Sequence, residues 1–148
     1  TTPGLRALEK YAVRCGGGRN HRFGLHDAVM LKDNHLIAAG SITAAVARVR
    51  ANVGHTVSVT VEVDRLDQID EALAAGADIL LLDNLGADAL AEAVARVHGR
   101  AVTEASGGIT AEAARGLAST GVEVLSLGWL THSAPQLDVA LDLDAGAP

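Results

Sequence analysis

The segment 16–36 carries a dense set of side chains able to bind anions. Three glycines open it, and Arg19, His21 and Arg22 follow within a few residues. An apolar run then ends abruptly at Lys32, which is followed by Asp, Asn and His. Enzymes of the α/β class place ligands at the carboxyl ends of buried strands, where such polar residues stand. Cations packed beside a flexible glycine turn therefore suit a small polyanion.

Four further strand-like runs also end in residues with chemical use: Glu62, Asp83, Glu104 with Ser106, and Gly128. Because the carboxyl ends of parallel strands meet on one face, we expect these residues to form one site with Lys32. Each acid taken singly is an ordinary helix cap or solvated loop residue, and their shared position favours a site. Glu62 and Asp83 are one repeat apart, so the pair could hold ribose hydroxyls or Mg²⁺.

Two glycine turns predict a phosphate site. Ser106, Gly107 and Gly108 come just before a predicted helix, where bare backbone N–H groups and the positive helix end attract anions. A Ser-Gly-Gly run alone is also an ordinary loop pattern. The turn at Gly128, with His132 after it, repeats the arrangement in the next unit, as at the phosphate site of βα barrels. His21, Arg22 and Lys32 then offer donors for carboxylates or a diphosphate.

Strands and helices must alternate to position these residues. Apolar and β-branched runs predict strands, and apolar residues at helical spacing that end at glycines predict helices. The predicted strands are 28–31, 57–63, 79–82, 101–103 and 122–127, and the predicted helices are 5–13, one capped by Ser41 or Thr43, 66–74, 89–97 and 111–119. Such βα units imply a parallel sheet with right-handed crossovers, in a barrel or an open doubly wound sheet.

We expect an α/β, TIM-barrel-like (βα) repeat domain over residues 1–135. A last strand-like piece, 137–143, lies beyond Pro135, so residues 136–148 form a separate strand and tail. The chain starts at Thr1 without an initiator Met, which suggests a fragment and an incomplete barrel.

Composition excludes several classes of protein. The 148 residues are 49% hydrophobic, enough for a real core, yet no apolar run approaches the roughly 20 residues of a membrane-spanning helix. A net charge of −6 argues against a nucleic-acid partner, although residues 1–22 hold five Lys/Arg and one acid. That basic part suits an anionic metabolite or is a solvated helix face. The single Cys15 cannot form an internal disulfide, so we expect a reducing cytoplasm, with this side chain in the core.

The motifs of the chain strongly resemble those of the quinolinate phosphoribosyltransferase family. The opening TTPGLR and LEKYAV, then GGG, NHR and LKDNH, are the specific part of the match. VEVD at 61–64, LLDN at 81–84, EASGGI at 104–109 and the run from Gly128 to Ser133 continue it in order. The resemblance covers nearly the whole chain.

The resemblance implies an enzyme of NAD biosynthesis that joins quinolinate to 5-phosphoribosyl-1-diphosphate with Mg²⁺, releasing nicotinate mononucleotide, diphosphate and CO₂. Its implied site residues carry over motif by motif. His21 and Arg22 would bind the quinolinate carboxylates, with Lys32 touching quinolinate or the diphosphate. Glu62 and Asp83 would serve the ribose and Mg²⁺, the metal being held mainly through the diphosphate. The phosphate would lie among Ser106, Gly107, Gly108, Gly128 and His132.

Three departures from the family pattern limit this expectation. The Arg-Lys pair that precedes the residue matching Thr1 is absent, and so is the N-terminal domain, which sends an arginine into the partner subunit's site. Thr60 stands where many members carry a further acid. We therefore expect the barrel part of a longer enzyme, a homodimer or higher homo-oligomer when complete, in which 137–143 pairs with the other domain. The alternatives are a phosphoribosyltransferase-like relative of the molybdenum-transport type and an inactive βα fragment that binds a phosphorylated ligand.

Overall fold

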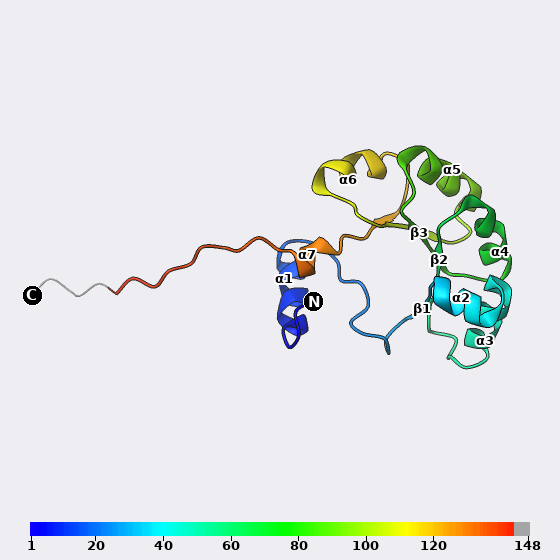
Figure 1. Cartoon of the computed structure of the whole chain (residues 1–148), viewed down its shortest axis with the longest axis horizontal. Helices are drawn as coiled ribbons and strands as arrows, with labels where there is room; N and C mark the ends of the chain where they lie inside the picture. Colours follow the sequence, from blue (N-terminus) through cyan, green and yellow to red (C-terminus); the bar gives the residue numbers. More distant parts are fainter. Residues whose placement is uncertain (144–148) are drawn as a thin grey trace, which may run out of the picture.

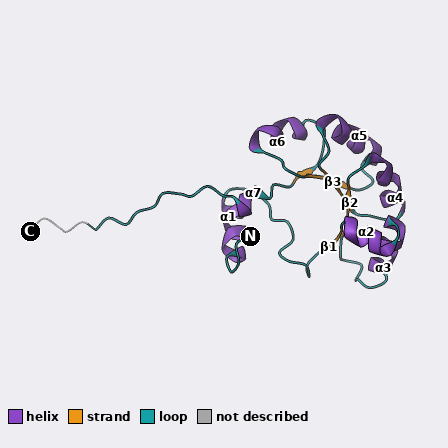
Figure 2. Cartoon of the chain, viewed as in Figure 1, coloured by secondary structure: helices purple, strands orange, loops and turns teal. Residues whose placement is uncertain are grey.

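The five predicted strands form one parallel sheet. In the computed structural model, which describes residues 1–143, the strands are β1 (Val29–Leu31), β2 (Val59–Val63), β3 (Ile79–Asp83), β4 (Val102–Ser106) and β5 (Val124–Leu125). They lie in sequence order, and every pairing is parallel. The sheet curves, with helices along its outer side (Figures 1 and 2). Within residues 1–143, β1 and β5 each pair with one strand, so this TIM-barrel-like sheet is open, as expected.

Helices follow the first four strands along the outside of the sheet. They are α2 (Asp33–Ala39), α3 (Ile42–Arg50), the 3₁₀ turn η1 (Leu66–Gln68), α4 (Ile69–Ala74), α5 (Ala87–Val97) and α6 (Ala111–Ala118). Ser41 caps α3 by accepting a hydrogen bond from the Ala44 amide at 3.0 Å. Two further helices, α1 (Arg6–Cys15) and α7 (Trp129–His132), lie beside each other on the open side (Figure 1). No helix within residues 1–143 is long and apolar enough to cross a membrane.

The hydrophobic core lies between the sheet and the outer helices. Alternate residues of the central strands point outward, and Val59, Val61, Val63, Leu80 and Leu82 are at most 1% exposed. They pack against buried helix residues: Val46, Ile69, Ala72, Leu90, Ala93 and Val97. Burying each such side chain contributes roughly 1.5–3 kcal/mol. This layer therefore supplies most of the stability of the fold.

The other strand residues form rows across the inner face. Neighbours in register on parallel strands point to the same side, so Met30, Thr60, Ile79 and Val102 make a largely apolar lower row. The next row is Glu62, Leu81, Glu104 and Val124, and Asp83 pairs with Ser106 above it. Polar residues thus gather toward the carboxyl ends of the strands.

Lys32 follows β1 directly, as expected, and is also the N-cap of α2, where its amide donates to the His35 ring at 3.0 Å. Two other local expectations were wrong. Cys15 is exposed, since nothing in the described chain covers that side of α1. β5 spans two residues because it pairs on one side only.

The predicted strand 137–143 is not formed. These residues extend away from the domain, and Leu137, Val139, Leu141 and Leu143 are each about 80% exposed or more (Figure 1). The alternating pattern predicts a strand, but a strand needs a neighbour for its backbone hydrogen bonds, and the described chain offers none here. The rest of the predicted tail, 144–148, lies outside the described residues.

Candidate active site

A cleft at the carboxyl edge of the sheet collects two of the predicted carboxylates. Its volume is about 400 Å³, and Glu62 and Asp83 both line it, together with residues of α2 and of the turn after β2. The remaining lining residues are Asp33, Leu36, Ile37, Asp64, Arg65 and Gln68. The expectation that Glu62 and Asp83 share one face of the sheet is therefore confirmed, although Glu62 lies one row lower than Asp83.

Lys32 reaches from the start of α2 to Glu62. Its ammonium forms an ion pair with Glu62 Oε2. The Glu62 side chain is 14% exposed and that of Lys32 45%, so the pair lies at the border between the sheet and the cleft. The Lys32 ammonium can move from the Glu62 carboxylate to bind an incoming anion, because lysine carries a compact charge on a flexible side chain.

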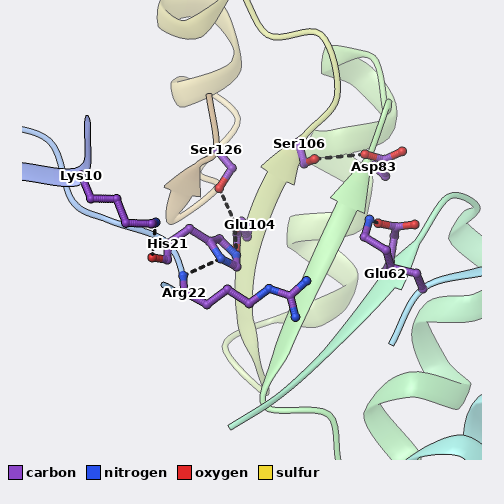
Figure 3. Close-up of polar contacts among 9 residues, drawn as sticks. Lys10, His21, Arg22, Glu62, Asp83, Glu104, Ser106 and Ser126 are labelled. Atoms are coloured by element: carbon purple, nitrogen blue, oxygen red, sulfur yellow. Dashed lines mark hydrogen bonds and ion pairs between the residues drawn. The ribbon is translucent and has the colours of Figure 1, made fainter. Parts of the chain in front are cut away.

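Asp83 is held by two neighbours at the end of β3. The Ser106 hydroxyl donates to Asp83 Oδ1 at 3.0 Å (Figure 3). The Asn84 side-chain amide donates to Asp83 Oδ2 at 2.6 Å. Both carboxylate oxygens are thereby oriented before any ligand arrives. The arrangement also ties the acid to the first residue of the predicted phosphate turn.

The turn at Gly107 can be built only from glycine. Its φ is +95°, and a Cβ there would lie 2.2 Å from Asn84 Oδ1 and 2.8 Å from the Asn84 amide nitrogen. Asn84 itself has a φ of 55°, and its amide donates to the Ser106 carbonyl at 2.9 Å. Gly108 also has a positive φ, of +58°, but open space around it. This turn leads directly into Thr110, the residue that caps α6.

The second glycine turn lies next to the first. The Trp129 indole N–H donates to the Ile109 carbonyl at 2.9 Å, which joins the start of α7 to the residue after Gly108. His132 lies over Gly128, where a Cβ would be 3.3 Å from the ring Nε2. Trp129 is thus a hydrogen-bond donor between the two turns.

His21 lies over the inner face of β4. Its Nε2 is 3.4 Å from Glu104 Oε1, and the Ser126 hydroxyl also donates to that carboxylate. Burial alone raises the pKa of Glu104, yet the hydrogen bonds from His21 and Ser126 outweigh it and hold the pKa below its ordinary value. Glu104 is therefore a buried carboxylate that stays ionised near neutral pH.

Arg22 follows on the same loop. Figure 3 shows its side chain extending across the inner face toward Glu62, and its guanidinium forms no hydrogen bond or ion pair with residues 1–143. Its backbone is tied down, because the Arg22 amide donates to His21 Nδ1 at 2.7 Å. The loop is also tied to α1, since Lys10 donates to the His21 carbonyl at 3.1 Å.

The carboxylates fit a magnesium ion that is carried mainly by its substrate. Within residues 1–143 no group of three or more potential ligands is close enough to hold a metal on its own. Mg²⁺ in phosphate-transfer sites is bound through one or two carboxylates plus the substrate's own phosphate oxygens. Glu62 and Asp83, on one cleft, offer a donor set of that kind.

Sequence reasoning missed two residues that orient the site. Asn84 carried no role, although its place after a strand-end acid and its tolerance of positive φ are signals for a tight turn. Ser126 also carried none, and only the pairing of β5 with β4 brings it to Glu104. Glu104 was placed at the site from its position on the strand, and its contact with His21 depends on the path of the loop.

A family model described as "Quinolinate phosphoribosyl transferase, C-terminal domain" matches residues 1–142. The chain is 50% identical over 143 residues to a probable nicotinate-nucleotide pyrophosphorylase (carboxylating) from Bacillus subtilis, covering 97% of this chain and 50% of that protein. It is 49% identical over 146 residues to the nicotinate-nucleotide pyrophosphorylase (carboxylating) of Mycobacterium leprae, with 97% and 51% covered.

Solved structures give the same likeness. A NadC deletion mutant superposes with a TM-score of 0.90 at 47% identity, covering 93% of this chain and 49% of that one. NadC from Streptococcus pyogenes superposes with a TM-score of 0.83 at 45% identity, covering 93% and 48%. The chain spans about half the length of the curated relatives it matches.

Proposed function

Because the chain belongs to the quinolinate phosphoribosyltransferase family, to whose C-terminal domain it corresponds, we propose that it carries the catalytic barrel of a nicotinate-nucleotide pyrophosphorylase (carboxylating). The proposed reaction transfers the phosphoribosyl group of 5-phosphoribosyl-1-diphosphate to quinolinate. Nicotinate mononucleotide, diphosphate and CO₂ are the products. The observation that carries the proposal is the gathering of cations, carboxylates and glycine turns of the family motifs at one edge of the sheet.

In this proposal, cationic side chains bind the two carboxylates of quinolinate. The Arg22 guanidinium extends over the inner face and can bind a carboxylate through two N–H groups, while Lys32 supplies a point charge at the cleft. Holding both carboxylates orients the pyridine ring so that its nitrogen faces the ribose carbon. Orientation of two reactants in this way lowers the barrier by removing the entropy cost of their encounter.

The carboxylate side chains stabilise the ribose during the transfer. As diphosphate leaves, positive charge develops on the ribosyl carbon, and Glu62 and Asp83 lie where their negative charge stabilises it. Mg²⁺, when bound, neutralises charge on the leaving diphosphate. The 5-phosphate would lie among Ser106, Gly107, Gly108, Gly128 and His132. Once its nitrogen is ribosylated, the positive pyridinium ring can stabilise the electron pair left on the adjacent ring carbon when the carboxylate departs as CO₂, and that carbon then takes up a proton.

The domain division and the assembly also belong to the proposal. Residues 1–135 would form the barrel, and residues 136–148 would pair with another part of a longer protein. The alternating apolar side chains of 137–143, which are exposed, favour this pairing. The complete enzyme would be a homodimer or higher homo-oligomer. We place it in the cytoplasm, in keeping with a chain that has one cysteine.

The test is formation of nicotinate mononucleotide from quinolinate and phosphoribosyl diphosphate with Mg²⁺, measured by mass spectrometry alongside calorimetric binding of quinolinate. Arg22→Ala should weaken quinolinate binding by roughly 10- to 150-fold and spare phosphoribosyl diphosphate, because a charge-assisted contact contributes about 1.5–3 kcal/mol and fixes the ring. Arg48→Ala, which removes an exposed charge on the outer helix α3, is the matched control and should bind normally. Failure of the wild-type chain to bind quinolinate would contradict the proposal. A plain phosphate-binding fragment would be unaffected by Arg22→Ala.

A further inference from the structure

A line of hydrogen bonds runs from β5 through β4 to the backbone of Arg22 (Figure 3). The Ser126 hydroxyl donates to Glu104 Oε1, His21 Nε2 lies 3.4 Å from the same oxygen, and the Arg22 amide donates to His21 Nδ1 at 2.7 Å. We propose that Ser126, Glu104 and His21 are positioning residues, which hold Arg22 where it can bind a carboxylate of the substrate. The identity of that substrate rests on the proposed function, whereas the relay of hydrogen bonds does not.

The relay defines the form of the His21 ring. An amide N–H can donate only to a ring nitrogen that carries no proton, so Nδ1 is the unprotonated nitrogen. The proton of the neutral ring is then on Nε2, which faces the Glu104 carboxylate. Both ring nitrogens are thus already paired.

The Glu104 end of the relay is held within the sheet, whereas the His21 end lies in an irregular loop. The Glu104 side chain is 6% exposed, within the paired part of β4, while that of His21 is 41% exposed. Residues 16–28 contain no helix or strand, so their position depends on side-chain contacts. The known contacts of this loop with α1, through Lys10 and Asn20, do not touch the sheet. The contact between His21 and Glu104 is what ties the loop to β4.

This assignment adds a role to the one expected of His21. The sequence motif suggested that His21 binds a quinolinate carboxylate directly. The contact of its Nε2 with Glu104 Oε1 gives the ring a second role, because it also places Arg22.

The hydrogen-bonding part of the proposal can be tested without substrate, by nuclear magnetic resonance of the whole chain labelled with ¹⁵N-histidine. At about pH 8 exposed histidine rings are neutral. His21, assigned by the loss of its signals in His21→Gln, should show one tautomer with a slowly exchanging proton on Nε2. Glu104→Ala should abolish the slow exchange, while Glu104→Gln should retain it, because the Gln carbonyl oxygen still accepts a hydrogen bond.

The positioning part is tested by binding and kinetics. Glu104→Ala should weaken quinolinate binding about tenfold or more, and Ser126→Ala less, as expected for the loss of one or two hydrogen bonds. Glu104→Gln and Ser126→Thr should restore most of the affinity. The KM for phosphoribosyl diphosphate should stay within about twofold in all four variants. Thr103→Val is the matched control: it removes a buried hydroxyl on the other face of β4, bonded to Glu123, without touching the relay.

The outcomes separate the two proposals. If the His21 spectrum in Glu104→Ala is the same as in the wild type, or if Nδ1 carries the proton, the relay is wrong. If Thr103→Val weakens quinolinate binding as much as Glu104→Ala does, the effect is one of stability, and the positioning role is overturned. If the spectra behave as expected but the wild-type chain binds no quinolinate, the proposed function fails and the relay stands.

Discussion

The outer and inner faces of the sheet are built from the same five strands, yet they have different roles. Outward residues such as Val61 and Leu80 are 0% exposed and meet only apolar neighbours. Inward residues of the same strands include Glu62 and Glu104, which form ion pairs, as well as Val102 and Val124, which are 39% and 41% exposed. Alternation along each strand therefore separates stability from chemistry residue by residue.

Mutations on the two faces should therefore differ in whether they change stability or binding. Outer substitutions should lower the free energy of unfolding and affect activity only through the folded fraction. Inner substitutions near the carboxyl ends should affect binding while the fold remains. The following variants test that contrast.

The largest effect on stability is expected from Leu82→Ala on β3. Its side chain is 1% exposed, so the substitution leaves a cavity and should cost about 2–5 kcal/mol of unfolding free energy in denaturant titrations. Val102→Ala on the inner face of β4 should cost less than about 1 kcal/mol, because that side chain is already partly in water. Equal losses for the two variants would break the contrast between the faces.

The largest effect on activity without loss of the outer core is expected from Gly107→Ala. The new Cβ would meet Asn84 at 2.2 Å, so the turn must shift, and Asp83 with it. A displacement on this scale costs about 100-fold in rate when it misplaces reacting groups. Gly108→Ala, with a positive φ but open space, should cost about tenfold or less. The measurement is kcat/KM for phosphoribosyl diphosphate, and a larger loss in Gly108→Ala would contradict the role of the Asn84 contact.

Two carboxylates at opposite edges of the sheet, Glu104 and Asp78, should both stabilise the fold against acid. The pKa of Glu104 is lowered in the folded state, so its stabilising effect is present above its unfolded pKa and is lost as pH falls through the folded pKa. In Glu104→Gln, Tm should therefore fall less steeply than in the wild type as the pH is lowered below the ordinary pKa of a glutamate.

The counterpart is Asp78, at the amino edge of β3. Burial raises the pKa of Asp78, but hydrogen bonds from the Val59 amide and Arg50 lower it by more. The net result is a pKa below the ordinary aspartate value. Asp78→Asn should flatten the same part of the Tm curve and leave quinolinate binding unchanged. If Asp78→Asn also weakens quinolinate binding, the two edges of the sheet are not independent.

A small effect on stability is expected from Ser41→Ala, at the start of α3 on the outer layer. The Ser41 hydroxyl accepts from the Ala44 amide, and loss of such a cap costs typically about 1 kcal/mol. Thermal unfolding measures it, with kcat as the second readout. Activity of the folded protein should not change, and Ser41→Asp should retain most of the stability because aspartate also caps.

Much of the fold could be read from local patterns. The alternating run at 57–63 and the apolar run at 79–82 predicted β2 and β3, and the glycines at 76, 99 and 121 predicted where three helices end. These features depend on residues close in sequence, because helix ends and strand alternation are set by backbone conformation and by which face is apolar. The parallel order followed from the βα repeat, since crossovers are right-handed.

The sequence by itself also determined which residues could belong to a site, because polar side chains at strand ends meet on one edge of any parallel sheet. Only the tertiary structure decided how they pair: Lys32 with Glu62, Ser106 with Asp83, and His21 with Glu104. These partners are 23 to 83 residues apart, and the contact of His21 also depends on the path of an irregular loop, so no local pattern encodes them. Whether Cys15 is buried and whether 137–143 forms a strand likewise depended on which surfaces find a neighbour.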